Sequence, residues 1–224
     1  MIEMIATTVE DAMEIEAGGA DRIELVSALS EGGLTPSFGL IEAVIQAVDV
    51  PVNVMVRPHS KSFVYTDVQI ELMKKDIICA KALGANGVVL GVLTEDNKVD
   101  TKKLACLLSV CDGLDVTFHR AIDETDVVSS VQQLTEYAKI TTILTSGGLA
   151  APIQENLEIV NEVVEQAKHI DILLGGGLTL GNIMAVAEKT KATSFHFGSA
   201  VSVNNDVDQA KVAQLVQLLE TNQT

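Results

Sequence analysis

Eight short, mostly apolar segments recur along the chain, and each is followed by a stretch with the periodicity of an amphipathic helix. Apolar strands without polar alternation are typical of parallel sheets that helices cover. We expect strands at Ile2–Ala6, Arg22–Val26, Val52–Val56, Gly87–Gly91, Asp115–His119, Thr142–Thr145, Asp171–Leu174 and Ser194–Phe197. The helical periodicity predicts helices at Val9–Ala17, Phe38–Val48, Val68–Leu83, Thr101–Cys111, Val127–Ala138, Asn156–Lys168, Leu180–Glu188 and Asp208–Leu219.

Strict alternation of eight strands with eight helices predicts an α/β fold, a single (β/α)8 TIM-like barrel over residues 1–224. The composition agrees, because hydrophobic residues make up 47% but aromatic residues only 3%, so Val, Ile, Leu and Ala must fill the core. Only 4 Pro are present, and no Ser-rich or charged run marks a linker. A doubly wound open sheet is the alternative fold.

The charge balance excludes several classes of partner. With 15 Lys and Arg against 31 Asp and Glu, the formal charge is −16, which repels nucleic-acid phosphates. The apolar runs have the length of strands rather than membrane spans, so we expect no membrane association and a cytoplasmic protein. Three cysteines without a paired motif, Cys79, Cys106 and Cys111, predict buried thiols rather than disulfides.

Charged side chains follow several of the predicted strands, and in a barrel the carboxyl ends of all strands meet at one face. Glu24 lies on strand 2, Arg57 follows strand 3, and His119, Arg120 and Asp123 follow strand 5. We expect His119 and Asp123 to form an acid–base pair, Arg57 and Arg120 to hold an anion, and Glu24 to be an alternative base. The competing interpretation is a structural layer of ion pairs that closes the barrel.

Glycine-rich segments follow the last strands and indicate an anion site. The predicted anion-binding residues are Thr145, Ser146, Gly176, Gly177, Gly198 and Ser199, and we expect a helix directly after the glycine triplet. The alternative is that these segments are only tight turns. Further rim candidates are Asn53, His59 and His196.

Two basic residues are assigned no catalytic role. Lys61 lies in a loop rather than at a strand end, which disfavours Schiff-base chemistry. His169 lies before strand 7, on the opposite face, and is predicted to be structural.

Several ordered motifs resemble the CutC family over nearly the whole chain. They are Gly19-Ala20-Asp21-Arg22-Ile23-Glu24-Leu25, Glu31-Gly32-Gly33-Leu34-Thr35-Pro36-Ser37, Val56-Arg57-Pro58 with Phe63 and Tyr65, Gly87-Val88-Val89-Leu90-Gly91-Val92-Leu93, Thr117-Phe118-His119-Arg120-Ala121 and Leu144-Thr145-Ser146-Gly147. The resemblance implies a TIM-like barrel, a cytoplasmic homodimer and a role in copper homeostasis with copper ion binding.

This chain departs from the resemblance where copper would bind. The family's copper assignment rests partly on cysteines near the ends of strands 1 and 2, where this chain has Ile5, Ala6 and Val26. The run His59-Ser60-Lys61-Ser62 also differs from the family's usual loop. Met4 and Met55 lie inside strands and are predicted to fill the core. No metal-ligand set or cofactor follows from the residues themselves, and copper is implied by the family name only.

Two functions therefore stay open. One is copper handling, with a copper ion as partner. The other is a lyase or isomerase that acts by general acid–base catalysis on a small phosphorylated or carboxylated metabolite.

Overall fold

The eight predicted strands form a closed parallel barrel in the computed structural model, which describes residues 1–149 and 152–221. In the barrel each strand pairs with its neighbours in chain order, and β8 pairs with β1, so the barrel itself has no open edge. The barrel prediction is confirmed and the open sheet is excluded. The strands are β1 (Ile2–Ala6), β2 (Arg22–Leu25), β3 (Val52–Met55), β4 (Gly87–Leu90), β5 (Asp115–Phe118), β6 (Thr142–Thr145), β7 (Asp171–Leu174) and β8 (Ser194–Phe197).

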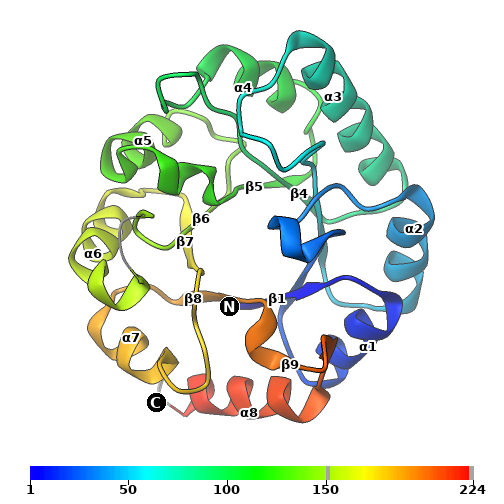
Figure 1. Ribbon diagram of the computed structural model, residues 1–224, viewed down its shortest axis with the longest axis vertical. Coiled ribbons are helices and arrows are strands. Elements are labelled where there is room, and N and C mark those ends of the chain that lie inside the picture. The colour runs from blue at the N-terminus through cyan, green and yellow to red at the C-terminus, as the bar shows by residue number, and fades with distance from the viewer. Residues whose placement is uncertain (150–151, 222–224) are drawn as a thin grey trace.

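Within the described residues, eight α-helices form a ring outside the barrel (Figure 1). They are α1 (Val9–Ala17), α2 (Phe38–Ala47), α3 (Asp67–Ala82), α4 (Thr101–Leu108), α5 (Val127–Leu134), α6 (Leu157–Gln166), α7 (Ile183–Lys189) and α8 (Gln209–Glu220). Short 3-10 helices interrupt the connecting loops at η1 (Leu29–Glu31), η2 (Arg120–Glu124), η3 (Ile153–Glu155) and η4 (Ser199–Val201). A small antiparallel ribbon of β9 (Ser202–Val203) and β10 (Asp206–Val207) precedes α8.

Side-chain caps fix where several helices begin. Thr66 precedes α3 and forms a reciprocal capping box with Gln69, which satisfies backbone N–H groups at both residues. Asp126 before α5 and Asp208 before α8 are simple side-chain caps, each of which accepts one backbone N–H group of its helix. In the described ranges 1–149 and 152–221, none of the helices is long and apolar enough to cross a membrane.

The helix expected directly after the glycine triplet is the main local error of the sequence prediction. α7 begins at Ile183, whereas the apolar pattern predicts a start at Leu180. Asn182 explains the delay, because its amide donates to the carbonyl of Gly177 and its oxygen accepts the N–H of Thr179. This side chain stabilises an extended loop between the glycines and the helix.

Candidate functional site

One cavity of about 320 Å³ opens at the face where the carboxyl ends of the strands meet. Polar groups from β2, β8 and the loops after β3 and β5 line it, namely Glu24, His196, Arg57, His119 and Arg120. Apolar walls come from residues such as Met55, Phe63 and Leu144. The segment with η1 and the loop after β7 lie over the barrel mouth (Figure 1). The cavity therefore lies at the face that the strand ends predicted.

A chain of buried charges lies at the bottom of this cavity. Arg22 Nε lies 2.5 Å from one oxygen of Glu3, and the other oxygen of Glu3 lies 2.7 Å from His196 Nδ1. On its other edge, His196 Nε2 lies 3.7 Å from a carboxylate oxygen of Glu24. All four side chains are buried. Only Glu24 and His196 line the cavity, so Glu3 and Arg22 support them from within the barrel.

The protonation of this chain follows from its contacts. Burial alone would raise the pKa of Glu3, but the hydrogen bond from His196 and the charge of Arg22 outweigh it and lower that pKa. Glu3 is thus ionised and accepts, so His196 Nδ1 donates. Burial would lower the pKa of His196, but the charge of Glu24 and the hydrogen bond to Glu3 raise it.

The Glu24 carboxyl keeps its proton to higher pH than an exposed glutamate does. Burial raises the pKa of Glu24 to about 7, and the positive charge of His196 only partly opposes that rise. One oxygen of Glu24, Oε1, is buried and has no hydrogen-bond partner in the described part of the chain. Glu24 and His196 are therefore two adjacent groups whose pKa values are both raised by their surroundings, that of Glu24 to about 7.

His119 has the opposite character, that of a neutral imidazole. Burial and the nearby charge of Arg57 lower the pKa of His119 to about 3. Its Nδ1 accepts the backbone N–H of Ala121 at 3.2 Å, so its proton lies on Nε2. A side chain at Gly91 would place its Cβ 2.5 Å from the imidazole ring, so glycine leaves the space in which the ring lies.

Arg57 lies beside His119 and against the same aromatic ring. Its terminal nitrogen Nη1 donates to the carbonyls of Glu31 and Gly33, which ties the loop after β2 to β3. The guanidinium carbon lies 4.8 Å from the centre of the Phe63 ring, and the imidazole centroid of His119 lies 4.9 Å from it. Phe63 thus packs against both polar side chains and fixes their position relative to each other.

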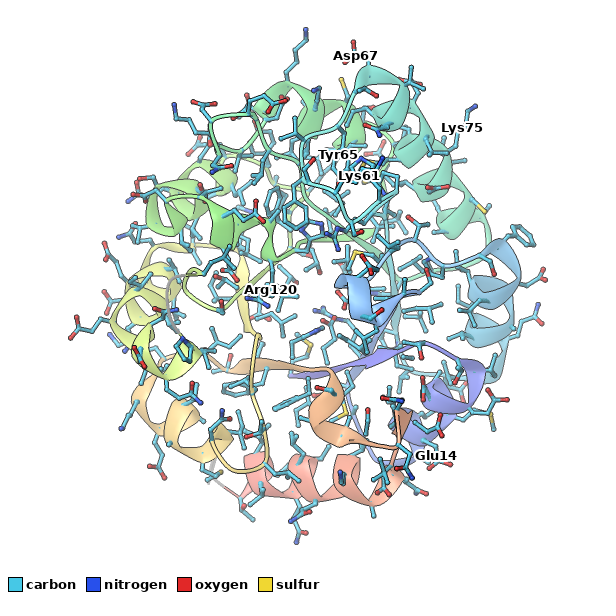
Figure 2. The ribbon with its side chains drawn as sticks, viewed as in Figure 1. Glu14, Lys61, Tyr65, Asp67, Lys75 and Arg120 are labelled. Atoms are coloured by element: carbon cyan, nitrogen blue, oxygen red, sulfur yellow. The ribbon has the colours of Figure 1, made fainter. Side chains whose placement is uncertain are left out.

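Arg120 reaches into the cavity but is held by Asp123 rather than by His119. Figure 2 shows the Arg120 side chain pointing toward the barrel centre, whereas Lys75 and Asp67 point away from it. Arg120 Nε donates to Asp123 at 2.8 Å, and Arg120 Nη2 donates to Ser146 Oγ. The remaining hydrogen bonds of Asp123 come from the Thr145 hydroxyl and from the N–H and hydroxyl of Ser146.

These contacts correct two predictions. The expected acid–base pair of His119 and Asp123 does not form in the described structure, because the donors around η2 and β6 occupy the carboxylate. Thr145 and Ser146 were expected to bind an anion, but their donors point to Asp123 and neither residue lines the cavity. Asp123 therefore orients Arg120.

The glycine-rich segments after β7 and β8 line the cavity, and their predicted anion binding stays a prediction. Gly176, Gly177, Gly198 and Ser199 all contribute to its wall. A Cβ at Gly176 would lie 2.8 Å from the Arg120 guanidinium carbon, so this glycine allows Arg120 to cross the loop. Gly177 has a φ of +95° and open space where a side chain would be, which leaves its backbone accessible.

The remaining candidates lie away from the cavity. Asn53 was predicted at the rim, but its oxygen accepts from Asn86, which precedes β4, so it lies toward the amino ends of the strands. His59 packs against Tyr65 with ring centroids 5.1 Å apart and is absent from the cavity wall. Lys61 is exposed near Tyr65 in the loop over α3 (Figure 2). His169 is exposed before β7, on the opposite face as expected.

Sequence reasoning missed Glu3 and Arg22 and ranked His196 too low. Each of the three is a polar side chain inside a predicted strand, at a position where the barrel interior would otherwise be apolar. That placement is the available signal, because buried charges occur in proteins mainly as partners of one another or of a ligand.

Comparisons with known proteins agree on one family. The family model described as "CutC family" matches residues 1–202. A copper homeostasis protein cutC homolog from Homo sapiens is 43% identical over 198 residues, which cover 88% of this chain and 72% of the relative. The solved structure of a CutC protein from Streptococcus agalactiae is 33% identical, with a TM-score of 0.85 over 90% of this chain and 99% of that one.

A more distant solved structure shares the fold alone. Phosphoribosyl anthranilate isomerase from Thermococcus kodakaraensis superimposes with a TM-score of 0.64 at 16% identity, over 97% of each chain. The family model, the identity with curated relatives and the structural match all lead to the same conclusion. This chain belongs to the CutC family.

Proposed function

We propose that this protein is an enzyme that transfers protons on a small phosphorylated or carboxylated metabolite. The observation that supports this most directly is the pairing of Glu24 and His196 in one cavity, with Glu3 hydrogen-bonded behind the imidazole. Glu3 holds Nδ1 of the His196 imidazole and thereby sets its tautomer. Nε2, the ring nitrogen that faces Glu24, is left for chemistry. The proposed reaction class is a lyase or an isomerase.

The two groups divide the work through their protonation. Because burial raises the pKa of Glu24 to about 7, the carboxylate removes a proton from a substrate without needing strongly alkaline conditions. His196, which Glu24 and Glu3 keep protonated to higher pH, donates a proton through Nε2. After a turnover Glu24 holds the proton that it took and His196 lacks the one that it gave, and transfer of this proton from Glu24 to His196 Nε2, 3.7 Å away, restores both groups.

Arg120 and the glycine loops form the proposed anion-binding side. Asp123 and Ser146 hold the guanidinium of Arg120, whose side chain is 41% exposed, at the cavity wall. Gly177 leaves its backbone open, and Ser199 adds a hydroxyl. A phosphate or carboxylate would form charge-assisted hydrogen bonds here, and the net charge of −16 would otherwise repel it.

A thermal-shift screen of phosphorylated and carboxylated metabolites tests the proposal. A ligand at 100 times its Kd stabilises the folded state by about 2.7 kcal/mol, which raises the melting temperature measurably. We expect Arg120→Met to reduce the shift, and Glu24→Gln to keep the shift but abolish turnover of the hit compound. Lys98→Met, which alters an exposed ion pair, is the matched control and should behave as the parent. Full turnover by Glu24→Gln would refute the proposed base.

The names of the relatives refer to copper homeostasis, and the described residues do not favour direct binding of Cu(I). Cu(I) prefers thiolate and thioether ligands. Cys79, Cys106 and Cys111 all lie outside the cavity wall, and burial raises the pKa of Cys111 to about 11. Met55 is the single sulfur ligand among the described residues of that wall. We expect no stoichiometric binding in a Cu(I) titration with a competing chelator, and one tightly bound ion per chain would contradict this.

A further inference from the structure

We infer that the substrate carries a carbonyl oxygen that binds Arg57 and His119, and that the reaction removes a proton from the carbon beside this carbonyl. The inference rests on the proposed acid–base function and names its substrate class. It comes from two buried hydrogen-bond donors of the cavity that the acid–base pair does not use.

The first donor is Nε2–H of His119. Since Nδ1 accepts the N–H of Ala121, the proton of the neutral ring must be on Nε2. That atom is buried and has no hydrogen-bond partner among residues 1–149 and 152–221, although His119 lines the cavity. An unpaired buried donor is costly, so its persistence points to an acceptor supplied by a ligand.

The second donor is Nε–H of Arg57. This atom is also buried and makes no hydrogen bond to a described residue, while the guanidinium as a whole interacts with the buried hydroxyl of Tyr65 and its Nη1 is fully engaged by two carbonyls. Phe63 packs against both side chains and holds the two groups together. One positive and one neutral donor thus belong to side chains that line the same cavity and pack on the same aromatic ring.

A pair of this kind suits an oxygen that gains negative charge. A neutral imidazole N–H and a guanidinium stabilise an enolate oxygen more than the carbonyl oxygen from which it forms. A purely apolar ligand would leave both donors unpaired. Glu24, whose Oε1 makes no hydrogen bond to a described residue, lines the same cavity and supplies the base.

The chemistry balances without an oxidant or a further reactant. Glu24 takes the proton from the carbon next to the carbonyl, the C–H electrons form a C=C bond, and the C=O π electrons move to the oxygen held by Arg57 and His119. Where the carbon that lost its proton carries a hydroxyl group, the hydroxyl proton passes to the enolate oxygen, a proton returns to the former carbonyl carbon, and the C=C electrons form the new C–H bond while the second oxygen becomes the carbonyl of the isomerised product. Loss of a leaving group from the enolate instead gives elimination. Both outcomes fall in the proposed reaction class.

A planar enolate mimic tests the inference. Phosphoglycolohydroxamate resembles an enediolate, phosphoglycolate has the same phosphate but an ordinary carboxylate, and inorganic phosphate tests the anion side alone. We expect calorimetric titration to show the hydroxamate binding at least tenfold more tightly than phosphoglycolate. His119→Asn keeps an acceptor for Ala121 but loses the Nε2 donor, so it should remove this preference without changing phosphate binding. His119→Gln returns an amide donor near the Nε2 position and should restore part of the preference.

The possible results separate the inference from the proposed function. Equal binding of hydroxamate and carboxylate, or a preference that His119→Asn leaves unchanged, overturns the carbonyl inference while phosphate binding still supports the anion site. Absence of binding by all three probes, with an unchanged melting temperature, overturns the proposed anion site and with it the inference. Circular dichroism of each variant shows whether the fold is kept.

Discussion

Replacing Glu24 by Gln should change how the stability of the protein depends on pH. Burial raises the pKa of Glu24 from 4.5 to about 7, so the folded state binds this proton more tightly than the unfolded chain does. The stabilisation from this group is therefore complete below pH 4.5 and is lost as the pH rises through 7. A shift of this size corresponds to about 3 kcal/mol, as an order of magnitude. Gln has nearly the same shape and never ionises, so it avoids this loss.

Urea unfolding of the parent and of Glu24→Gln between pH 5 and pH 8.5 measures the effect. We expect the free energy of unfolding of the variant, relative to the parent, to rise by up to about 3 kcal/mol across this range. Glu42→Gln on α2 removes an exposed carboxylate and is the matched control, whose curve should run parallel to that of the parent.

A second readout comes from His196. Because the charge of Glu24 raises the pKa of His196, Glu24→Gln should lower the midpoint of the imidazole titration seen by NMR. Parallel stability curves for the parent and Glu24→Gln would refute the reasoning, since they would mean that Glu24 ionises in the cavity without cost. An unchanged His196 midpoint would show that the two groups are not coupled.

The other predictions concern groups that position the site. Gly91→Ala places a Cβ 2.5 Å from the His119 ring, so we expect a loss of about 1–3 kcal/mol in denaturant unfolding and a displaced imidazole signal; an unchanged protein would contradict the close contact. Asp123→Ala strips the partner from Arg120 and from the buried donors of β6, and should cost about 3 kcal/mol and weaken phosphate binding. Thr66→Ala removes the cap of α3 and should cost about 1 kcal/mol without affecting ligand binding, which makes it a stability control.

The positions of the strands could be predicted because buried parallel strands have a distinct composition. Each of the eight was expected within one residue of its observed end. The ends of the helices were less accurate, because they depend on contacts that the apolar pattern does not encode. α5 ends at Leu134 rather than Ala138, and Asn182 delays α7 through hydrogen bonds to its own loop.

The location of the candidate site could be predicted from the sequence better than the contacts between its side chains. Glu24, Arg57, His119 and Arg120 all reach the cavity because strand ends converge in a barrel. Which carboxylate faces which donor is decided by the loops. η2 turns Asp123 toward β6 and away from His119, and no periodicity in the sequence reports such a turn.

Closure of the barrel brings together Glu3, His196 and Glu24, and so creates the acid–base pair of Glu24 and His196. Glu3 and His196 are 193 residues apart, yet they are direct neighbours in the register of β1 and β8, the two strands that close the barrel. In an open sheet these strands would lie at separate places, and His196 would have no carboxylate behind it. The same closure forces Glu24, one strand further along, to share the buried space of His196. The raised pKa of Glu24 is therefore a consequence of the barrel topology as much as of the residue type. A search for patterns along the chain finds Glu24, but it does not find that His196 is its neighbour in space.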